Sequence, residues 1–214
     1  MNAMLRVILV LFLMASGVHH AWAHPHVWVS VTAQLIYTPQ GEVSGVRHAW
    51  TFDDAYSAFA AQGLDKNNDG IYSTDELSEL AKTNVESLSE FGYFTFLKID
   101  GKQQALNTPQ DYTLSYDKKK MVLNFTLPLK DQSKSKSAIG LEVYDPTYFV
   151  SFAFNDGDAA VTTQGAPSGC AVKIHRPTPD PKVQEMLSKL SADVSLEGTE
   201  FGVQMASKAI VVCP

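Results

Sequence analysis

The chain has 214 residues, of which 45% are hydrophobic and 19% charged, and its formal net charge is −6 at pH 7. This composition is typical of a globular protein with a sizeable core. The negative charge argues against nucleic acid or an anionic membrane surface as the binding partner, because both repel an acidic protein, and it is compatible with cations.

Residues 1–23 have the pattern of a secretory signal peptide. Arg6 gives a short positive start, residues 7–18 are an apolar run too short to span a bilayer, and a small-x-small cleavage site ends at Ala23. We therefore expect cleavage after Ala23, so that a periplasmic protein begins at His24 and, without Arg6, is one unit more negative. No later segment is apolar enough over a sufficient length to cross a membrane, so we expect no stable membrane insertion.

Strand patterns fill most of the mature chain. Residues 27–37 alternate and are rich in β-branched and aromatic side chains, residues 38–42 hold the Pro and Gly of a turn, and residues 43–52 can return as a hairpin arm. Further strands are predicted at 93–99, 112–116, 121–129, 138–144, 148–154, 159–163, 170–175 and 207–214.

Helical spacing interrupts the strands at 53–64 and 74–91 and returns at 182–190 behind Pro181. This order predicts an α+β fold. We expect one mostly antiparallel, sandwich-like β domain at 24–214, with a helix–loop–helix insertion at about 53–91 between its second and third strands.

The sequence DKNNDGIYSTDE at 65–76 fits the twelve-residue EF-hand calcium loop. A Ca²⁺ ion takes about six to eight oxygen ligands, and this spacing supplies side-chain oxygens, a backbone carbonyl, a water-mediated contact and a bidentate carboxylate. The expected ligands are Asp65, Asn67, Asp69, Ile71 through its carbonyl, Ser73 through water and Glu76. Gly70 permits the sharp turn. The alternative is a surface turn that keeps this sequence without the ion.

Calcium loops of this kind usually occur in pairs, and the sequence holds no second one. Another element therefore has to support the back of the loop. A lone site in an exported protein is more typical of a structural calcium ion than of a sensor.

The two cysteines, Cys170 and Cys213, both lie in the mature chain. Because an exported protein meets an oxidising compartment, we predict that they form one disulfide, which joins the C-terminal strand to one about forty residues earlier. A zinc site through these cysteines is the weaker alternative, because CxxC-type spacing is absent.

Histidines stand at the start of the mature chain. The α-amine and imidazole of an N-terminal His24 form a bidentate chelate, and His26 adds a second imidazole. Pro25 lacks the amide N–H that the amino-terminal copper or nickel motif needs, which disfavours square-planar binding. A tetrahedral site with further ligands from the fold stays open, as does an ordinary N-terminal tail without metal.

The hairpin suggests further ligands. A tight turn that pairs Tyr37 with Val43 puts His26 opposite Asp54, and His48 then projects from the same face. A slip of one residue would spoil this arrangement.

Acidic residues complete the candidate set. Asp53 and Asp54 would add oxygen donors, giving the N and O set that suits zinc, nickel or cobalt. Asp145 interrupts two aromatic-rich strands and would place a carboxylate at one end of the sheet, although an Asp-Pro pair there is also an ordinary turn. His175 is a less well supported candidate.

These features together resemble a known family. A signal peptide followed by HPHVWV, a WTFDD segment, a calcium-type loop, VYDPTYFVSF and two late cysteines are similar to the periplasmic family of unknown function labelled "ABC-type transport system, periplasmic component". The resemblance covers nearly the whole mature chain. His24 and His26 match the family's histidine pair, Asp53 and Asp54 its acidic segment, and Asp145 its tyrosine-aspartate-proline motif.

Members of that family are frequently encoded beside membrane transporters of the nickel/cobalt exporter type, some of them linked with zinc. The resemblance implies a periplasmic metal-handling accessory protein for such a transporter, with zinc, nickel or cobalt as its ion. The mature chain leaves little room for the two closing lobes of an ABC-importer receptor, so we do not expect that role.

Two alternatives stay open. The first is a calcium-stabilised interaction module that binds no transition metal. The second is a copper oxidase in which the N-terminal histidine acts as a brace, with His48 or His175 as a further ligand. We expect no enzyme, because the sequence has no serine–histidine–acid, paired-carboxylate or nucleotide-loop signature.

Overall fold

The computed structural model describes residues 25–135, 137–178, 180–190, 194, 196, 198–199 and 201–214. The predicted signal peptide, its cleavage site and His24 lie outside these residues. Within the described ranges, none of the helices has the length and apolar character needed to cross a bilayer.

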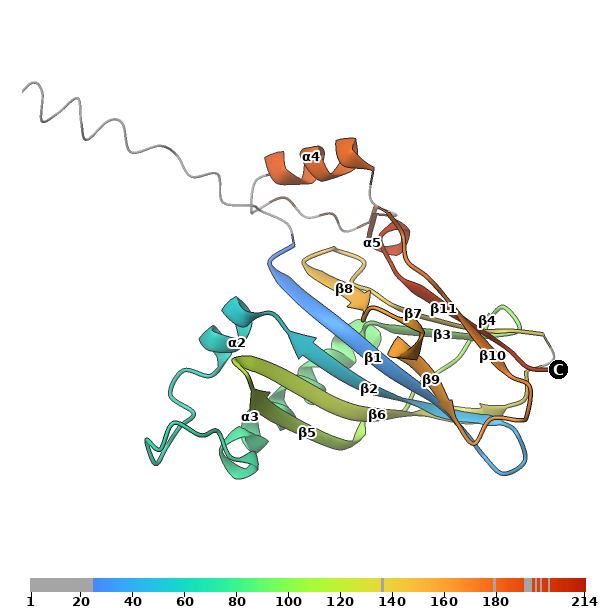
Figure 1. The fold of residues 1–214 in the computed structure, drawn as a ribbon, viewed down its shortest axis with the longest axis horizontal. Coiled ribbons are helices and arrows are strands. Elements are labelled where there is room, and N and C mark those ends of the chain that lie inside the picture. The colour runs from blue at the N-terminus through green and yellow to red at the C-terminus, as the bar shows by residue number, and fades with distance from the viewer. Residues whose placement is uncertain are drawn as a thin grey trace, which may run out of the picture.

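The described elements form an α+β fold with mostly antiparallel sheets, as predicted (Figure 1). The strands are β1 (Val27–Tyr37), β2 (Val43–Phe52), β3 (Thr95–Ile99), β4 (Lys102–Gln103), β5 (Gln110–Asp117), β6 (Lys120–Ser133), β7 (Ile139–Val143), β8 (Val150–Phe154), β9 (Val161–Gln164), β10 (Ala171–His175) and β11 (Lys208–Val212). The helices are α2 (Asp54–Ala60), α3 (Thr74–Leu88), α4 (Pro181–Lys189) and α5 (Phe201–Gln204), with 3₁₀ turns η1 (Ser89–Phe94) and η2 (Asp158–Ala160).

The strands form two sheets. One has the order β5-β6-β2-β1-β8, with β9 also paired to β1, and the other has the order β10-β11-β7-β3-β4. The first part of β1 pairs in parallel with β8 and its second part in parallel with β9, whereas β2 lies antiparallel on its other side. Strand β1 is therefore the strand through which late segments of the chain join the N-terminal hairpin.

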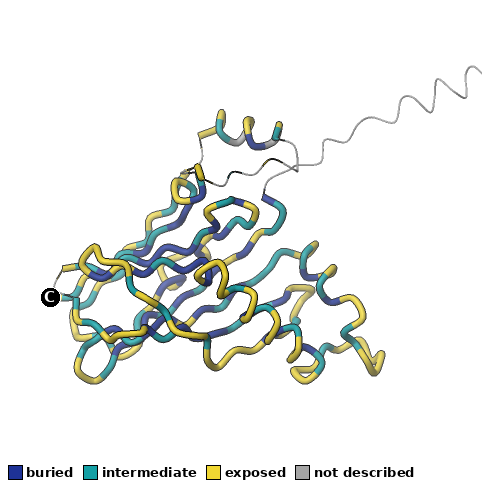
Figure 2. Tube along the Cα trace, turned by 180° about the vertical axis from the view of Figure 1, so that it is seen from behind, coloured by how far each residue is buried: buried dark blue, intermediate teal, exposed yellow. Residues whose placement is uncertain are grey.

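The core lies between the two sheets. Alternate residues of β1 are buried, and Val31 and Leu35 belong to the same hydrophobic cluster as Leu97 of β3, Leu141 of β7 and Val211 of β11. Figure 2 shows that the buried residues follow the strands, while the exposed residues gather in the connecting loops. Full burial of each such side chain stabilises the fold by about 1.5–3 kcal/mol, so these facing strands account for much of the stability.

The insertion after β2 contains the predicted helices. Helix α3 buries Leu77, Ala81 and Val85, which repeat every four residues and so form one stripe, and it packs on β5. The N-terminus of α3 has a capping box in which Ser73 and Glu76 exchange side-chain and backbone hydrogen bonds. The chain then passes through η1 directly into β3.

The predicted hairpin register holds at the turn and fails beyond it. Tyr37 pairs with Val43 as expected, but Ile36 pairs with Gly45, so Ser44 is an extra residue in the second strand. This β-bulge shifts the rest of the pairing by one residue.

The shift overturns the prediction that His26, His48 and Asp54 project from the same face of the hairpin. His48 pairs with Ala33, so the β1 residues on its side of the sheet are the odd-numbered ones, which face the core. His26 precedes the first residue of β1, and Asp54 begins α2 instead of continuing β2. The expectation that these three side chains project together is wrong, because side chains alternate and a one-residue slip reverses every one of them.

The predicted disulfide is confirmed. Cys170 immediately precedes β10 and is bonded to Cys213, which immediately follows β11. Because β10 and β11 are antiparallel neighbours, the bond closes the outer edge of the second sheet.

Removing this cross-link tests its contribution to stability. The double variant Cys170→Ala/Cys213→Ala is expected to lower the free energy of unfolding by about 2–4 kcal/mol, because the unfolded chain regains the entropy of an open loop. The measurement is denaturant unfolding followed by circular dichroism. Wild-type protein reduced with dithiothreitol should show a similar loss, and an unchanged midpoint in both samples would contradict the expectation.

Candidate functional site

Three segments far apart in the sequence meet at one end of the first sheet. The backbone N–H of His26 donates to the carbonyl oxygen of Phe149 over 2.9 Å. The N–H of Trp28 donates to the carboxylate of Asp53, and the N–H of Asp53 donates to the carbonyl of Trp28, both over 2.9 Å. The HPHVWV, WTFDD and VYDPTYFVSF segments are thus held together by backbone hydrogen bonds.

Asp53 organises the start of α2. One carboxylate oxygen accepts from the N–H of Tyr56 over 2.9 Å and so caps the helix, while the other accepts from Trp28. The neighbouring Asp54 is 70% exposed and lies 3.4 Å from the ammonium of Lys120. Of the two predicted acidic ligands, Asp54 is the one whose carboxylate faces solvent.

Asp145 is buried, with 4% of its surface exposed, at the turn between β7 and β8. One carboxylate oxygen accepts from the N–H and the hydroxyl of Thr147, each over 2.8 Å, and the other accepts from the N–H of Val150 over 3.0 Å. These three donors compensate the buried charge and fix the turn. The turn, in which Tyr148 has φ 55°, also explains why β8 begins at Val150 and not at the predicted residue 148.

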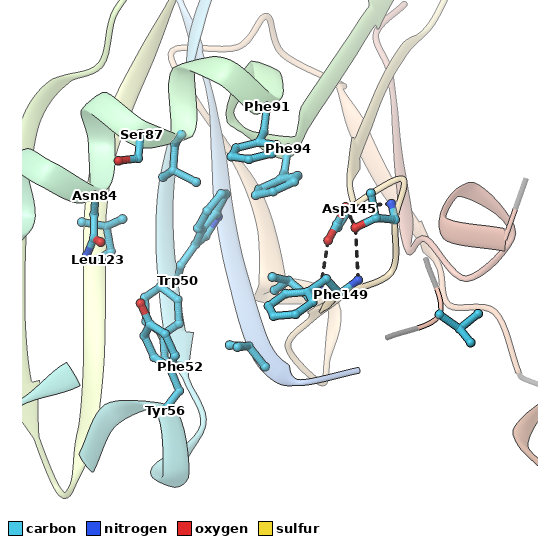
Figure 3. A pocket seen from close by; sticks show the side chains of 15 residues that line it. Trp50, Phe52, Tyr56, Asn84, Ser87, Phe91, Phe94, Leu123, Asp145 and Phe149 are labelled. Carbon is cyan, nitrogen blue, oxygen red and sulfur yellow. Dashed lines mark hydrogen bonds between the residues drawn. The ribbon is translucent and has the colours of Figure 1, made fainter. Parts of the chain in front are cut away.

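A pocket of about 550 Å³ opens between this turn and the inserted helices (Figure 3). Its lining residues come from β1, β2, β6, β8, the β7–β8 turn, α2, α3 and η1, with Val194 between α4 and α5. They are Val27, Trp50, Phe52, Tyr56, Asn84, Ser87, Leu88, Phe91, Phe94, Leu123, Asp145, Thr147, Phe149, Val150 and Val194. Each of the three segments that meet here contributes to the lining, so the pocket is where these motifs converge.

Aromatic rings make up the walls of the pocket. Phe52 and Tyr56 are stacked with ring centres 4.7 Å apart, and Phe91 and Phe94 are stacked at 5.2 Å. Figure 3 shows Trp50 between the two pairs. The sequence predicted these rings only as parts of strands and helices, and it did not predict the pocket. The available signal was the concentration of aromatic residues in WTFDD and VYDPTYFVSF, the same segments that suggested metal ligands.

His48 lies in the core between the sheets. It is 1% exposed, and its Nε2 lies 3.2 Å from the hydroxyl oxygen of Thr95 on β3 of the other sheet. The Thr95 hydroxyl donates to the carbonyl of Tyr93 over 2.8 Å, so we assign the imidazole proton to Nε2, from which it is donated to Thr95. In the described part of the chain the His48 Nδ1 atom has no hydrogen-bond partner.

Burial lowers the pKa of His48 from 6.5 to about 3, because a charged imidazolium would lose its hydration among Trp50 and Phe125. His48 also precedes Asp53 by five residues along an extended strand, a separation of about 17 Å. The structure therefore does not bring His48 together with Asp53 or Asp54. His175, at the end of β10, is exposed.

The loop at 65–76 turns its carboxylates toward its own backbone. Asp65 accepts from the N–H of Gly70 over 2.9 Å, and Asp69 accepts from the N–H of Ile71 over 2.7 Å. Glu76 accepts from the N–H of Lys66 over 2.8 Å. Gly70 has φ +78°, the left-handed conformation that glycine adopts without strain.

Glu76 is held in its charged form. The backbone N–H and hydroxyl of Ser73 both donate to its carboxylate, over 2.9 and 2.7 Å, and with the N–H of Lys66 they lower the pKa of Glu76 from 4.5 to about 2. A carboxylate that stays ionised at any physiological pH suits a cation-binding loop.

The loop rests on β5. The ring of Tyr72, in the eighth position of the loop, lies 4.6 Å from the ring of Tyr116. This contact places an aromatic ring of β5 against the loop. Among the residues that the structure describes, no group of three or more His, Cys, Asp or Glu side chains is arranged to hold a metal ion.

The sequence of this chain matches one protein family and is similar to two uncharacterised bacterial proteins. The sequence model of a family described as "Protein of unknown function (DUF1007)" matches residues 9–213. An "Uncharacterized protein" of Haemophilus influenzae is 24% identical over 195 residues, which cover 89% of this chain and 91% of the relative. An "Uncharacterized 15.5 kDa protein in trpE 3'region" of Spirochaeta aurantia is 27% identical over 111 residues, which cover 51% of this chain and 79% of the relative.

The buried His48 makes stability depend on pH. Its folded-state pKa of about 3 lies below the usual 6.5, so the unfolded chain takes up the proton first as the pH falls. The contribution is complete above pH 6.5 and is lost between there and pH 3, which amounts to about 2 kcal/mol between pH 7 and pH 5.

Denaturant unfolding at several pH values measures this dependence. His48→Leu is expected to be less stable than wild type at pH 7, because it loses the bond to Thr95, but to have a flatter pH profile between 7 and 5. The exposed His175→Gln serves as the control and should keep the wild-type slope. An unchanged slope in His48→Leu would rule out this origin of the pH dependence.

Proposed function

We propose that this chain, which belongs to the family described as "Protein of unknown function (DUF1007)", is an exported periplasmic metal-binding accessory protein. In this proposal it binds zinc, nickel or cobalt and works with a membrane transporter of that ion, in a binding rather than a catalytic role. The observation that carries the proposal is the anchoring of the N-terminal segment through His26, Trp28 and Asp53 at one end of the sheet.

The proposed transition-metal ligands begin with His24 and His26. Cleavage after Ala23 would give His24 a free α-amine that chelates together with its own imidazole. The hydrogen bond from His26 to Phe149 and the contact of their rings, with centres 4.6 Å apart, support a fixed position for His26. The α-amine and the two imidazoles are nitrogen donors, and zinc binds nitrogen ligands in tetrahedral sites.

The acidic candidates have different roles in this proposal. Asp54 is the preferred oxygen ligand, because its carboxylate is exposed and only ion-paired with Lys120. Asp53 and Asp145 instead position the segments around the site, since the carboxylate of Asp53 joins β1 to the start of α2 and that of Asp145 is buried in the β7–β8 turn. His48 is enclosed in the core and is left out of the ligand set.

We propose in addition that the loop at 65–76 binds calcium and stabilises the insertion. Its donors are the carboxylates of Asp65, Asp69 and Glu76 with the side-chain oxygens of Asn67 and Ser73 and the carbonyl of Ile71, all oxygen atoms that suit a hard cation. The inward carboxylates, the left-handed Gly70 and the support from Tyr116 favour this role.

A second candidate function is a calcium-stabilised interaction module that binds no transition metal. The observation that favours it is the burial of His48, which removes one predicted transition-metal ligand, beside the contact of Tyr72 in the 65–76 loop with Tyr116. The copper-enzyme alternative needs His48 or His175 as a further ligand, and the burial of His48 speaks against it.

Competitive zinc titration distinguishes these candidates. Protein beginning at His24, saturated with calcium, is expected to bind zinc with a sub-micromolar Kd. The variant His24→Ala/His26→Ala should bind at least about tenfold more weakly, a loss of at least about 1.4 kcal/mol, because the chelate is removed. The exposed His175→Ala is the control and should bind like wild type. Equal, weak zinc binding by all three proteins would contradict the metal-binding proposal and favour the calcium-stabilised interaction module.

Calcium binding is tested by thermal unfolding with and without the ion. At a calcium concentration about a hundredfold above its Kd, wild-type protein should gain about 2.7 kcal/mol of stability. Asp65→Asn/Glu76→Gln should gain none, because two of the charged ligands are lost. Glu79→Gln removes an exposed charge from α3 outside the loop and should respond as wild type does. A calcium response retained by the double variant would refute the site.

A further inference from the structure

We infer that the aromatic pocket between α3 and the β7–β8 turn binds an uncharged apolar small molecule. This binding activity shares no ligand residue with the proposed metal and calcium sites, although the rim residue Phe149 contacts His26. It rests on the depth of the pocket, the chemistry of its lining and the exposure of its rim.

The pocket reaches from the surface to the core. Trp50 and Leu123, which contribute to its lining, are 1% and 0% exposed, whereas Phe91 and Phe149 are 55% and 49% exposed. A cavity of about 550 Å³ with this depth is in the range of small-molecule sites, of roughly 300–1,000 Å³. A docking surface for a folded partner would be flatter, so the depth favours a small molecule that enters the pocket.

The lining has no free charge to offer a charged ligand. No Lys, Arg or His belongs to the described lining, and the carboxylate of Asp145 is already compensated by three donors from Thr147 and Val150. An ionic group brought to this site would lose its hydration without gaining a partner of opposite charge. The electrostatics therefore select a molecule that is neutral in its buried part.

The walls favour an apolar body with a small polar group. The stacked pairs Phe52–Tyr56 and Phe91–Phe94 present ring surfaces from two sides (Figure 3). Asn84 and Ser87, both on α3, place an amide and a hydroxyl on one wall. An alkyl or aryl molecule would bury its body against the rings, and a neutral hydrogen-bonding group would fit the α3 side.

The exposed rings at the rim support this assignment. Exposed single aromatic side chains are common, but Phe91 and Phe149 come from segments more than fifty residues apart and both line the same pocket. Leaving them in water costs hydrophobic free energy that a bound apolar molecule would recover.

The test is a fluorescence titration of calcium-saturated, zinc-free protein beginning at His24 with N-phenyl-1-naphthylamine, a neutral apolar probe. Wild-type protein is expected to show saturable binding of one probe per chain. Ser87→Phe fills the pocket from an exposed helix position and should weaken binding at least tenfold. Lys82→Phe adds the same ring to α3 outside the lining and should bind like wild type.

A second pair of variants removes rings instead of adding them. Phe91→Ala should weaken probe binding, whereas Phe59→Ala, which removes a 71% exposed ring outside the lining, should not. Circular dichroism checks that all four variants are folded. Displacement of the probe by 1-dodecanol or by indole then tells whether an alkyl or an aryl body is preferred.

Absence of saturable probe binding by wild-type protein would overturn the inference, as would equal binding by Ser87→Phe and wild type. Because the titration contains no zinc and the variants leave the histidines and the calcium loop intact, its result is independent of the metal proposal.

Discussion

The pairing of β1 with three other strands is the constraint on which the rest of the structure depends. Its antiparallel pairing with β2 builds the N-terminal hairpin, and its parallel pairing with β8 and β9 brings the second half of the chain to the same place. The hydrogen bond between His26 and Phe149 extends this pairing to the start of the described chain. Without β1, the segments around the candidate site would have no common support.

Two hydrogen-bonded carboxylates, the partly exposed Asp53 and the buried Asp145, give this end of the molecule its shape. Asp53 and Asp145 each satisfy both oxygens with backbone or hydroxyl donors, and for the buried Asp145 these bonds offset the cost of an unpaired carboxylate. Asp53 caps the start of α2, and Asp145 fixes the turn between β7 and β8. Gly202 of α5 lies against this second turn, where an added Cβ would collide with the backbone carbonyl oxygen of Asp145. The hydrogen bonds of Asp145 and the close packing of Gly202 thus fix the β7–β8 turn at the rim of the pocket.

Helix α3 connects the insertion with the pocket. Glu76, which belongs to the acidic loop, also closes the capping box that starts α3. About two to three turns later the same helix presents Asn84, Ser87 and Leu88 to the pocket. The loop and the pocket wall are therefore two ends of one rigid element that packs on β5 through its buried stripe.

The sequence by itself determined what depends on neighbours in the chain. Alternation in 27–37, the turn at 38–42, the start of α3 at Thr74 and the disulfide between the only two cysteines follow from local pattern or simple count. The tertiary structure alone decided the bulge at Ser44, the burial of His48 and the pocket. These features arise from pairing and packing between distant segments, and a single extra residue in a strand reverses which side chains face the core.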